Sequence, residues 1–281
     1  MPRLDPVPPL PREIEEALDA AGRLDDRAID LAGTALLLAA LDRPGVSLAK
    51  YRDHLDDTVA ALRDSGATTA AEVAGALQRV FADRFGYDGD RLTYDDPQNA
   101  NLIRVIDRRK GLPVALGILF AHAARGAGFA LDGLAFPGHF LMRLDVKGER
   151  LILDPFNGGR VMDVMEMRRL VKQLMGPEQE LTPQLTDTVG NRAILLRLQN
   201  NLKARAQAEG NVERVARLSR VMLRLAPEDS ALWLEYGKAE HQLGRLGAAS
   251  SALETCIEHS LDGFETIEAQ RLLEQLRRSL N

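Results

Sequence analysis

His139 and Asp154 stand fifteen residues apart in the segment FPGHFLMRLDVKGERLILDPFNGG, near equivalent ends of two candidate strands. A turn at "KG" (147–148) joins these strands, and antiparallel pairing brings the two side chains close together. A carboxylate that accepts the imidazole N–H fixes its tautomer, and the other ring nitrogen is then free to act as a base on a thiol or water. The sequence therefore predicts a His139–Asp154 pair. The alternative is a structural pair that only ties the two strands together.

The elements that position this pair follow from the spacing of apolar residues. From Ile14 to about Phe85 apolar residues recur every three and four positions, which predicts several helices broken at 42–45 and 65–69. Pro113 suits the first turn of a helix, and Gly128 suits its end, so a central helix is expected over 113–127. Short strand-like segments then predict a small antiparallel sheet over about 131–162, followed by one more helix.

The C-terminal part has a different pattern. The stretch 176–190 contains Pro, Gly and Thr and is interpreted as a linker, and from about 191 the pattern is purely helical. The spacing of Trp233, Gly237, Gly244 and Ala249 fits the 34-residue tetratricopeptide pattern, with a final helix from Phe264 to Leu280. The fold class is therefore α+β over 1–175, followed by an all-α repeat module over 191–281. Trp233 is expected to have a structural role, largely buried between helical hairpins.

Composition excludes several classes of function. Acidic residues outnumber basic ones 41 to 36, which argues against nucleic-acid binding. The single cysteine, Cys256, excludes an intrachain disulfide and a Cys-cluster metal site, and its place in the repeat pattern indicates a packing residue. No apolar run is long enough for a membrane span, and the start MPRLDPVPPLPREIEE lacks an export signal. We expect a cytoplasmic protein without metal or cofactor; the oligomeric state stays open.

A resemblance to a known family rests on three segments. DPQNANLIRVIDRRKGLPVALGILFAHAARGAGF, then PGHFLMR, then LDPFNGG, with tetratricopeptide repeats behind, is similar to the SirB-type proteins, described as regulators of sirC expression with a transglutaminase-like domain. The resemblance covers nearly the whole chain, and PGHF and DPFNGG are its most specific parts. It implies a papain-like cysteine-protease-type fold for the first domain, with Gly138, Phe140 and Asn157 as binding residues beside the His–Asp pair.

The resemblance also exposes a missing group. In transglutaminase-like folds a catalytic Cys opens a helix that ends in Arg-x-x-Gly, here Arg125 to Gly128, and the usual step back leads to Pro113. Neither Pro113 nor its neighbours through Ala115 carry a thiol or hydroxyl, so the usual covalent route is closed. We therefore expect a non-catalytic regulatory or scaffold protein whose degenerate cleft still binds a ligand. Its repeats would bind a protein or peptide. The alternative is a hydrolase in which His139 and Asp154 activate water directly.

Overall fold

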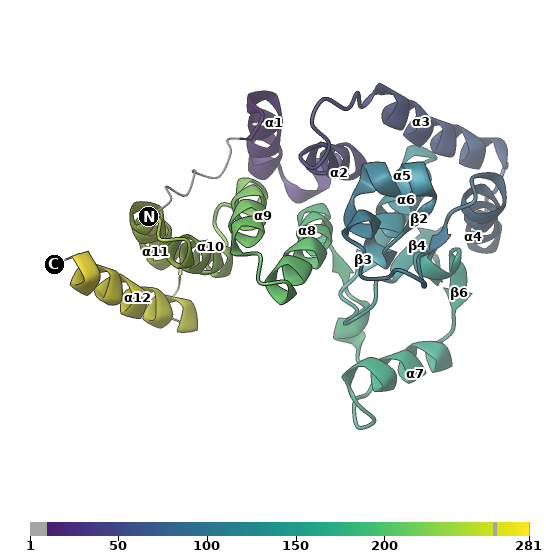
Figure 1. The fold of residues 1–281 in the computed structure, drawn as a ribbon. Helices are drawn as coiled ribbons and strands as arrows, with labels where there is room; N and C mark the ends of the chain where they lie inside the picture. The colour runs from purple at the N-terminus through teal and green to yellow at the C-terminus, as the bar shows by residue number, and fades with distance from the viewer. Residues whose placement is uncertain (1–9, 261–262, 281) are drawn as a thin grey trace. The chain divides into compact units, whose positions relative to one another are not determined.

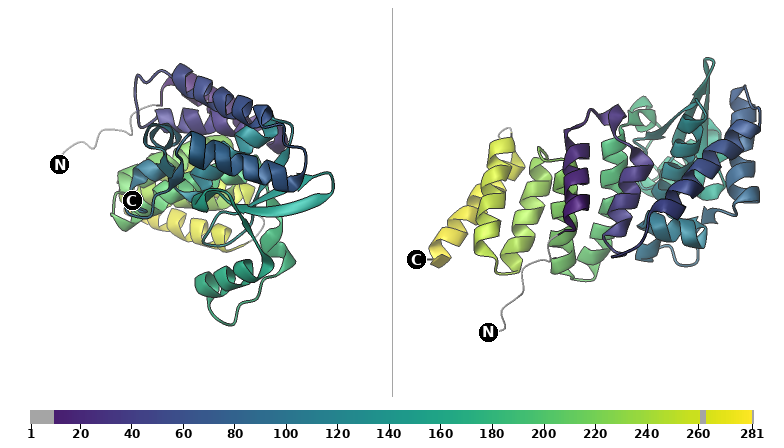
Figure 2. Two further views of the ribbon diagram at one scale, coloured as in Figure 1. Left: turned by 90° about the vertical axis from the view of Figure 1, so that its right-hand side faces the viewer. Right: turned by 90° about the horizontal axis from the view of Figure 1, so that it is seen from above.

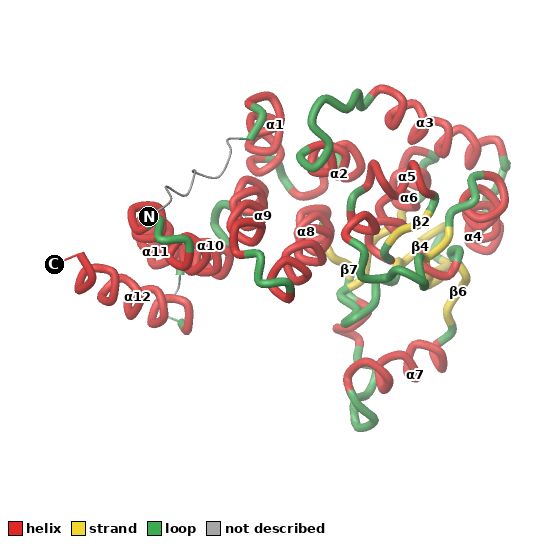
Figure 3. The backbone as a smooth tube through the Cα atoms, in the orientation of Figure 1, coloured by secondary structure: helices red, strands yellow, loops and turns green. Residues whose placement is uncertain are grey.

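The computed structural model describes residues 10–260 and 263–280, and the chain forms two compact units. One unit is Asp26–Leu198, and the other combines Met1–Asp25 with Gln199–Asn281. Most of the N-terminal stretch on which the export argument rests, residues 1–9, lies outside the described residues. Figure 3 shows that the strands belong to the first of these units, whereas the described part of the other is helical.

Helices make up most of the unit Asp26–Leu198 (Figure 1). Their ends follow from local sequence. Asp30 caps α2, and the pairs Thr69 with Glu72 and Asp163 with Glu166 form capping boxes that start α4 and α7. The α-helices of this unit are α2 (Leu31–Ala40), α3 (Ala49–Asp64), α4 (Ala70–Gln78), α5 (Leu102–Arg108), α6 (Pro113–Gly126) and α7 (Val164–Met175), and α8 (Asn191–Ala208) begins in it. A π-helical turn, Arg79–Arg84, extends α4.

Helix α6 is the centre of this unit. Pro113 occupies its first turn, as expected, and eleven of its residues are buried, so the helix is surrounded by the core over most of its length. Gly128 follows its end at a φ of +92°, a left-handed conformation that glycine adopts without strain. The predicted central helix is therefore observed within one residue of its expected bounds.

A five-stranded sheet packs beside the helices, in the order β6-β5-β4-β3-β7. All of its neighbouring strands are antiparallel. Lys147 and Gly148 both have positive φ, as a tight hairpin turn of two residues requires, and this turn sets the register of Val146 opposite Glu149. The strands are β3 (Ala130–Leu134), β4 (Met142–Val146), β5 (Glu149–Asp154), β6 (Arg160–Met162) and β7 (Thr188–Val189).

Two strand pairings were not predicted from the sequence. The expected linker contains β7, which pairs with β3 and adds an edge to the sheet. The segment after Phe85, for which no strand was predicted, contains β1 (Asp88–Gly89), which pairs in parallel with β2 (Lys110–Gly111) over two residues. Both segments are too short to produce an alternating pattern, so tertiary contacts rather than local sequence decide their conformation.

The other unit consists of antiparallel helices placed in a row, drawn from green to yellow in Figure 2. Besides the rest of α8 it contains α9 (Val212–Leu225), α10 (Ser230–Gln242), α11 (Leu246–His259) and α12 (Phe264–Leu280). Gly237 packs against Leu253, where a Cβ would come within 2.9 Å of that side chain, so a small residue lets α10 and α11 approach. Cys256 is fully buried in the core between these helices, as its position in the repeat predicts.

Helix α1 (Arg12–Arg23) belongs to this second unit, although the sequence analysis counted it with the first domain. Arg224 of α9 pairs with Glu15 and with Asp19 at 3.0 Å. Gly22 lies so close to the Arg224 carbonyl oxygen that a Cβ there would sit 2.1 Å from it. These contacts join segments two hundred positions apart, which no local pattern indicates. The domain limits at 175 and 191 stay predictions.

Candidate functional site

The predicted His139–Asp154 pair is present in the structure. The Nε2 atom of His139 lies 3.0 Å from Oδ1 of Asp154, within the range expected for a hydrogen bond. Asp154 ends β5, and His139 lies in the loop between β3 and β4. The sequence analysis placed both residues near strand ends, and the hairpin at Lys147–Gly148 brings these ends together.

Asp154 accepts further hydrogen bonds from the turn that follows it. The backbone N–H groups of Phe156 and Asn157 donate to Oδ1 at 3.1 and 3.3 Å, and the Asn157 side-chain amide donates to Oδ2 at 2.6 Å. Burial alone raises the pKa of this carboxyl, but the hydrogen bonds from His139 and Asn157 outweigh burial and lower the pKa below its ordinary value. Asp154 is therefore an ionised acceptor.

The state of Asp154 determines the tautomer of His139. Because an ionised carboxylate only accepts hydrogen bonds, Nε2 of His139 carries the proton that it donates. In the neutral ring Nδ1 then has a free lone pair, and it has no hydrogen-bond partner among residues 10–260 and 263–280. This is the arrangement that a general base requires.

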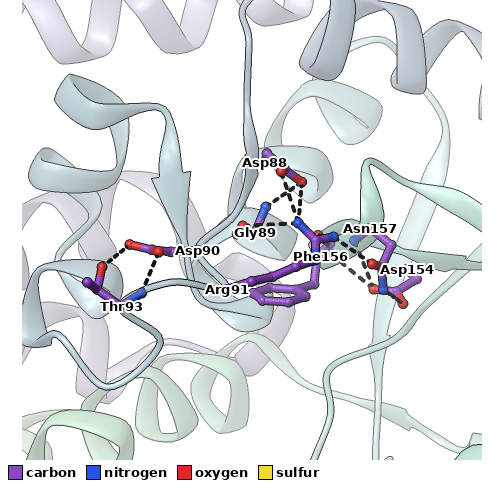
Figure 4. Close-up of polar contacts among 8 residues, drawn as sticks. All are labelled: Asp88, Gly89, Asp90, Arg91, Thr93, Asp154, Phe156 and Asn157. Carbon is purple, nitrogen blue, oxygen red and sulfur yellow. Dashed lines mark hydrogen bonds and ion pairs between the residues drawn. The ribbon is translucent and has the colours of Figure 1, made fainter.

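Two arginines from distant segments hold the loops that carry the pair. Arg197 of α8 donates to the carbonyl oxygens of Phe136 and His139 at 3.0 and 2.6 Å. On the other side, Arg91 donates to the side-chain oxygen of Asn157 at 2.7 Å and to the Phe156 carbonyl at 3.3 Å (Figure 4). Both arginines thus fix backbone and side chains next to the pair. Neither arginine is evident from the sequence, because each lies about sixty residues from the pair and belongs to no motif.

The segment with Arg91 packs closely on the turn after Asp154. Arg91 also binds the Asp88 carboxylate, and its guanidinium lies 5.1 Å from the centre of the Phe156 ring. A Cβ on Gly89 would come within 2.5 Å of Phe156, so this position requires glycine. The same ring lies nearly perpendicular to the His139 ring, with centroids 6.1 Å apart. Strand β1 therefore supports the pair through Phe156.

The pair opens onto a cleft of about 360 Å³. Helix α7 forms one wall, and an ion pair between Arg160 and Glu166, 2.6 Å apart, lies at the cleft. The lining residues are His139, Asp154, Asn157, Arg160, Met162, Glu166, Arg169, Leu170 and Gln173. A cleft of this size holds a small ligand or a few residues of a peptide.

One face of α6 packs against the loops that flank His139 and Asp154. Gly117 meets the Phe140 ring, where a Cβ would lie 2.4 Å from it, and Phe120 meets Gly159 in the same way. Pro113 precedes these residues by four and seven positions, so it lies on the same face. Pro113, Val114 and Ala115 are buried and have no thiol or hydroxyl.

The other predicted site residues have different positions. Asn157 lines the cleft and holds Asp154. Gly138 has a φ of +66° in the loop next to His139. Phe140 is 1% exposed and packs between Gly117 and Gly133. The binding roles expected for Gly138, Phe140 and Asn157 stay predictions.

Trp233 packs against the core of the repeat unit. The ring is partly buried, and its indole N–H donates to the Pro227 carbonyl in the turn before α10, at 2.7 Å. Cys256, in the same unit, is fully buried, and burial raises the pKa of its thiol. The chain's single thiol is thus held in its protonated form inside the repeat core.

The described part of the chain contains no group of three or more His, Cys, Asp or Glu side chains arranged to hold a metal ion. No helix within it is both long enough and apolar enough to cross a membrane.

Comparisons with known proteins agree with this architecture. Residues 49–200 match the family model of the transglutaminase-like superfamily, and residues 202–277 match a tetratricopeptide repeat model. A UPF0162 protein of Xylella fastidiosa is 33% identical over 239 residues, which cover 82% of this chain and 84% of the relative. The chain therefore belongs to the transglutaminase-like superfamily and, within it, to the UPF0162 proteins.

Two further relatives support the resemblance that the sequence motifs predicted. A UPF0162 protein of Vibrio cholerae is 35% identical over 188 residues, covering 66% of this chain and 68% of the relative. Protein SirB1 of Salmonella typhimurium is 27% identical over 199 residues, covering 69% of this chain and 73% of SirB1. The similarity to SirB-type proteins is confirmed.

Proposed function

We propose that this protein is a cytoplasmic, non-catalytic regulatory or scaffold protein. Its transglutaminase-like cleft binds a peptide or small ligand, and its repeat module binds a protein or peptide partner. The observation that supports the proposal is the first turn of α6, where Pro113, Val114 and Ala115, the residues at which the family resemblance places the nucleophile, carry no thiol or hydroxyl. Without a thiol or hydroxyl there, no acyl-enzyme forms at that position.

The partner-binding part of the proposal is supported by the repeat architecture. Stacked helical hairpins form an extended surface that suits peptides, and the repeat model covers residues 202–277. Cross-linking the full chain in cells of its source, with identification of the linked sites, tests this part. The proposal expects one reproducible partner linked to α8, α10 or α12. Recovery of no reproducible partner on these helices would reject it.

A second candidate, a hydrolase that uses His139 to activate water, is favoured by one observation. Nδ1 of His139 is free of hydrogen bonds among the described residues, and the pair lines a cleft. A base of this kind supplies only about 10²- to 10⁴-fold, so it also needs donors for a developing negative charge. Backbone amides in the first turn of α6 are the candidates, with the exception of Pro113, which has no N–H.

One comparison separates the two candidates. The wild type, His139→Ala and Cys256→Ala are assayed in parallel for peptide hydrolysis and for incorporation of a fluorescent amine into a glutamine-containing protein. The non-catalytic proposal expects all three to match the rate without protein. Hydrolysis that is lost in His139→Ala and kept in Cys256→Ala would instead establish the hydrolase.

A further inference from the structure

A cavity of about 520 Å³ lies between α1, α9 and α10 in the repeat unit, and its volume is in the usual range of small-molecule sites. It shares no lining residue with the cleft of His139 and Asp154. We call this cavity the arginine pocket. Its charged and aromatic lining residues are Asp19, Arg23, Arg220, Arg224, Trp233 and Tyr236.

Helix α1 completes the arginine pocket. Gly22 lies against the Arg224 carbonyl oxygen, and the Arg224 side chain pairs with Glu15 and Asp19, so α1 packs directly on α9 (Figure 1). Asp19 and Arg23 of α1 then form one side of the pocket. Because α1 lies outside residues 202–277, which match the repeat model, the pocket is not a general feature of stacked repeats.

The charges of the arginine pocket favour an anion. Three arginines line it, whereas Asp19 is the single acid among its lining residues. Asp19 binds Arg224 at 3.0 Å and forms no ion pair with Arg23. The Arg23 side chain is exposed in the last turn of α1 and has no hydrogen-bond or ion-pair partner among residues 10–260 and 263–280. A guanidinium in this state, beside further arginines, is suited to bind an anionic group.

A phosphate group matches several arginines better than a carboxylate does. One guanidinium fork saturates a carboxylate, whereas a phosphate has three terminal oxygens and more negative charge, so it accepts hydrogen bonds from more than one arginine. Arg23 and Arg220 belong to different helices and line the same cavity. Their arrangement therefore favours a phosphate between them.

The aromatic side of the pocket favours a flat ring. Trp233 and Tyr236 lie one turn apart on α10, with ring centroids 6.3 Å from each other. The indole N–H already donates to the Pro227 carbonyl, which fixes the orientation of the Trp233 ring. Trp233 thus offers aromatic surface rather than a hydrogen-bond donor, and such surface suits the stacking of a base.

We propose that the arginine pocket binds a nucleotide, with its phosphates on Arg23 and Arg220 and its base against Trp233 and Tyr236. A nucleotide combines a flat ring with phosphate in a molecule that a cavity of this volume holds. A nucleic-acid strand is disfavoured, because the chain carries a net charge of −5 and lacks the positive charge that a phosphate backbone requires.

Trp233 makes this site observable, since it is the single tryptophan of the chain. The full chain is titrated with ADP, GDP, CDP and UDP, followed by tryptophan fluorescence and by calorimetry. At least one of them is expected to quench the emission saturably, with a Kd below about 1 mM. Its nucleoside is expected to bind about tenfold more weakly or less, because it lacks the charged hydrogen bonds to the arginines. Pyrophosphate is expected to displace the nucleotide.

Variants locate the binding. Arg23→Ala is expected to weaken nucleotide binding about tenfold or more, because it removes a charged partner of the phosphates. The matched control is Arg12→Ala, which removes an exposed arginine of the same helix that pairs with Glu16 and does not line the pocket. It is expected to change the affinity less than about twofold. Trp233→Leu is expected to weaken the nucleotide more than it weakens pyrophosphate.

Other outcomes overturn the inference. If none of the four nucleotides binds saturably below about 1 mM, the pocket is not a nucleotide site. A nucleotide whose affinity is the same in Arg23→Ala as in wild type binds elsewhere. Pyrophosphate that binds as tightly as every nucleotide would show an anion site without recognition of a base. O-phosphotyrosine that binds more tightly than all four would identify a phosphorylated side chain as the ligand instead.

Discussion

Asp154 belongs to the proposed transglutaminase-like cleft and Gln207 to the proposed binding module of the repeats. The two polar side chains differ in burial and in hydrogen bonding. Asp154 is 1% exposed and accepts hydrogen bonds from His139, Phe156 and Asn157. Gln207 is exposed, and its side chain has no hydrogen-bond partner among the described residues. The first arrangement fixes a geometry and contributes to stability, whereas the second leaves its hydrogen-bonding groups for a ligand. A site can thus keep its architecture after losing its nucleophile, because the same contacts hold the fold.

The largest expected effect concerns the packing beneath the pair. Phe140→Ala removes a ring that fills the space between Gly117 and Gly133, so it is expected to cost about 3 to 5 kcal/mol of unfolding free energy. Denaturant unfolding followed by circular dichroism measures this loss. The control is Phe264→Ala in the repeat unit, whose ring is 70% exposed and whose loss is expected to cost less than about 0.5 kcal/mol. Equal losses of unfolding free energy for Phe140→Ala and Phe264→Ala would contradict the expected difference between the buried and the exposed ring.

Replacing Asp154 is expected to give the second-largest loss of stability. Asp154→Ala leaves buried donors of Phe156 and Asn157 without an acceptor, which is expected to cost about 1 to 3 kcal/mol at neutral pH. Because the pKa of Asp154 is lowered on folding, its contribution is complete above the unfolded value of about 3.9 and is lost as pH falls through the folded value.

Urea unfolding at a series of pH values tests this titration. Wild type is expected to lose more stability than Asp154→Asn as the pH falls below about 4, since the amide does not titrate there. Parallel curves for the two proteins would mean that the carboxylate makes no net contribution.

Trp233 is expected to give a smaller effect than a core tryptophan. Since it is only partly buried, Trp233→Ala is expected to cost about 1 to 2 kcal/mol, below the values of full core truncations. Unfolding followed by circular dichroism measures it. A loss of 4 kcal/mol or more, roughly the size of a core truncation, would mean that the ring packs more tightly than its surroundings indicate.

The smallest expected change in stability is at two exposed glutamines of the repeat unit, Gln207 and Gln242. Gln207→Ala/Gln242→Ala is expected to alter the unfolding free energy by less than about 0.5 kcal/mol, because neither side chain has a partner to lose. In wild type the single tryptophan, Trp233, reports unfolding of this unit by fluorescence. A destabilisation well above 1 kcal/mol, beyond the usual range for surface changes, would give these glutamines a structural role.

Local patterns in the sequence predicted most helices and strands and the His139–Asp154 pair. They did not predict the long-range contacts that fix the position of the pair. The turn at Lys147–Gly148 and the strand pattern around it were sufficient to place His139 beside Asp154. The roles of Arg91 and Arg197 arise from contacts about sixty residues apart, and the pairing of β7 from only two residues. Such contacts depend on the assembled fold, so no periodicity or motif in the sequence predicts them.

Restoring a thiol at the start of α6 tests the central claim most directly. In a Cys256→Ala background, Pro113→Cys, Val114→Cys and Ala115→Cys are alkylated with iodoacetamide across a range of pH, each with and without His139→Ala. If the site is a transglutaminase-like cleft without its nucleophile, at least one variant has a thiol pKa well below the free value of about 8.5, and His139→Ala raises it again. Titration near 8.5 in all three, without any response to the loss of His139, would contradict the account.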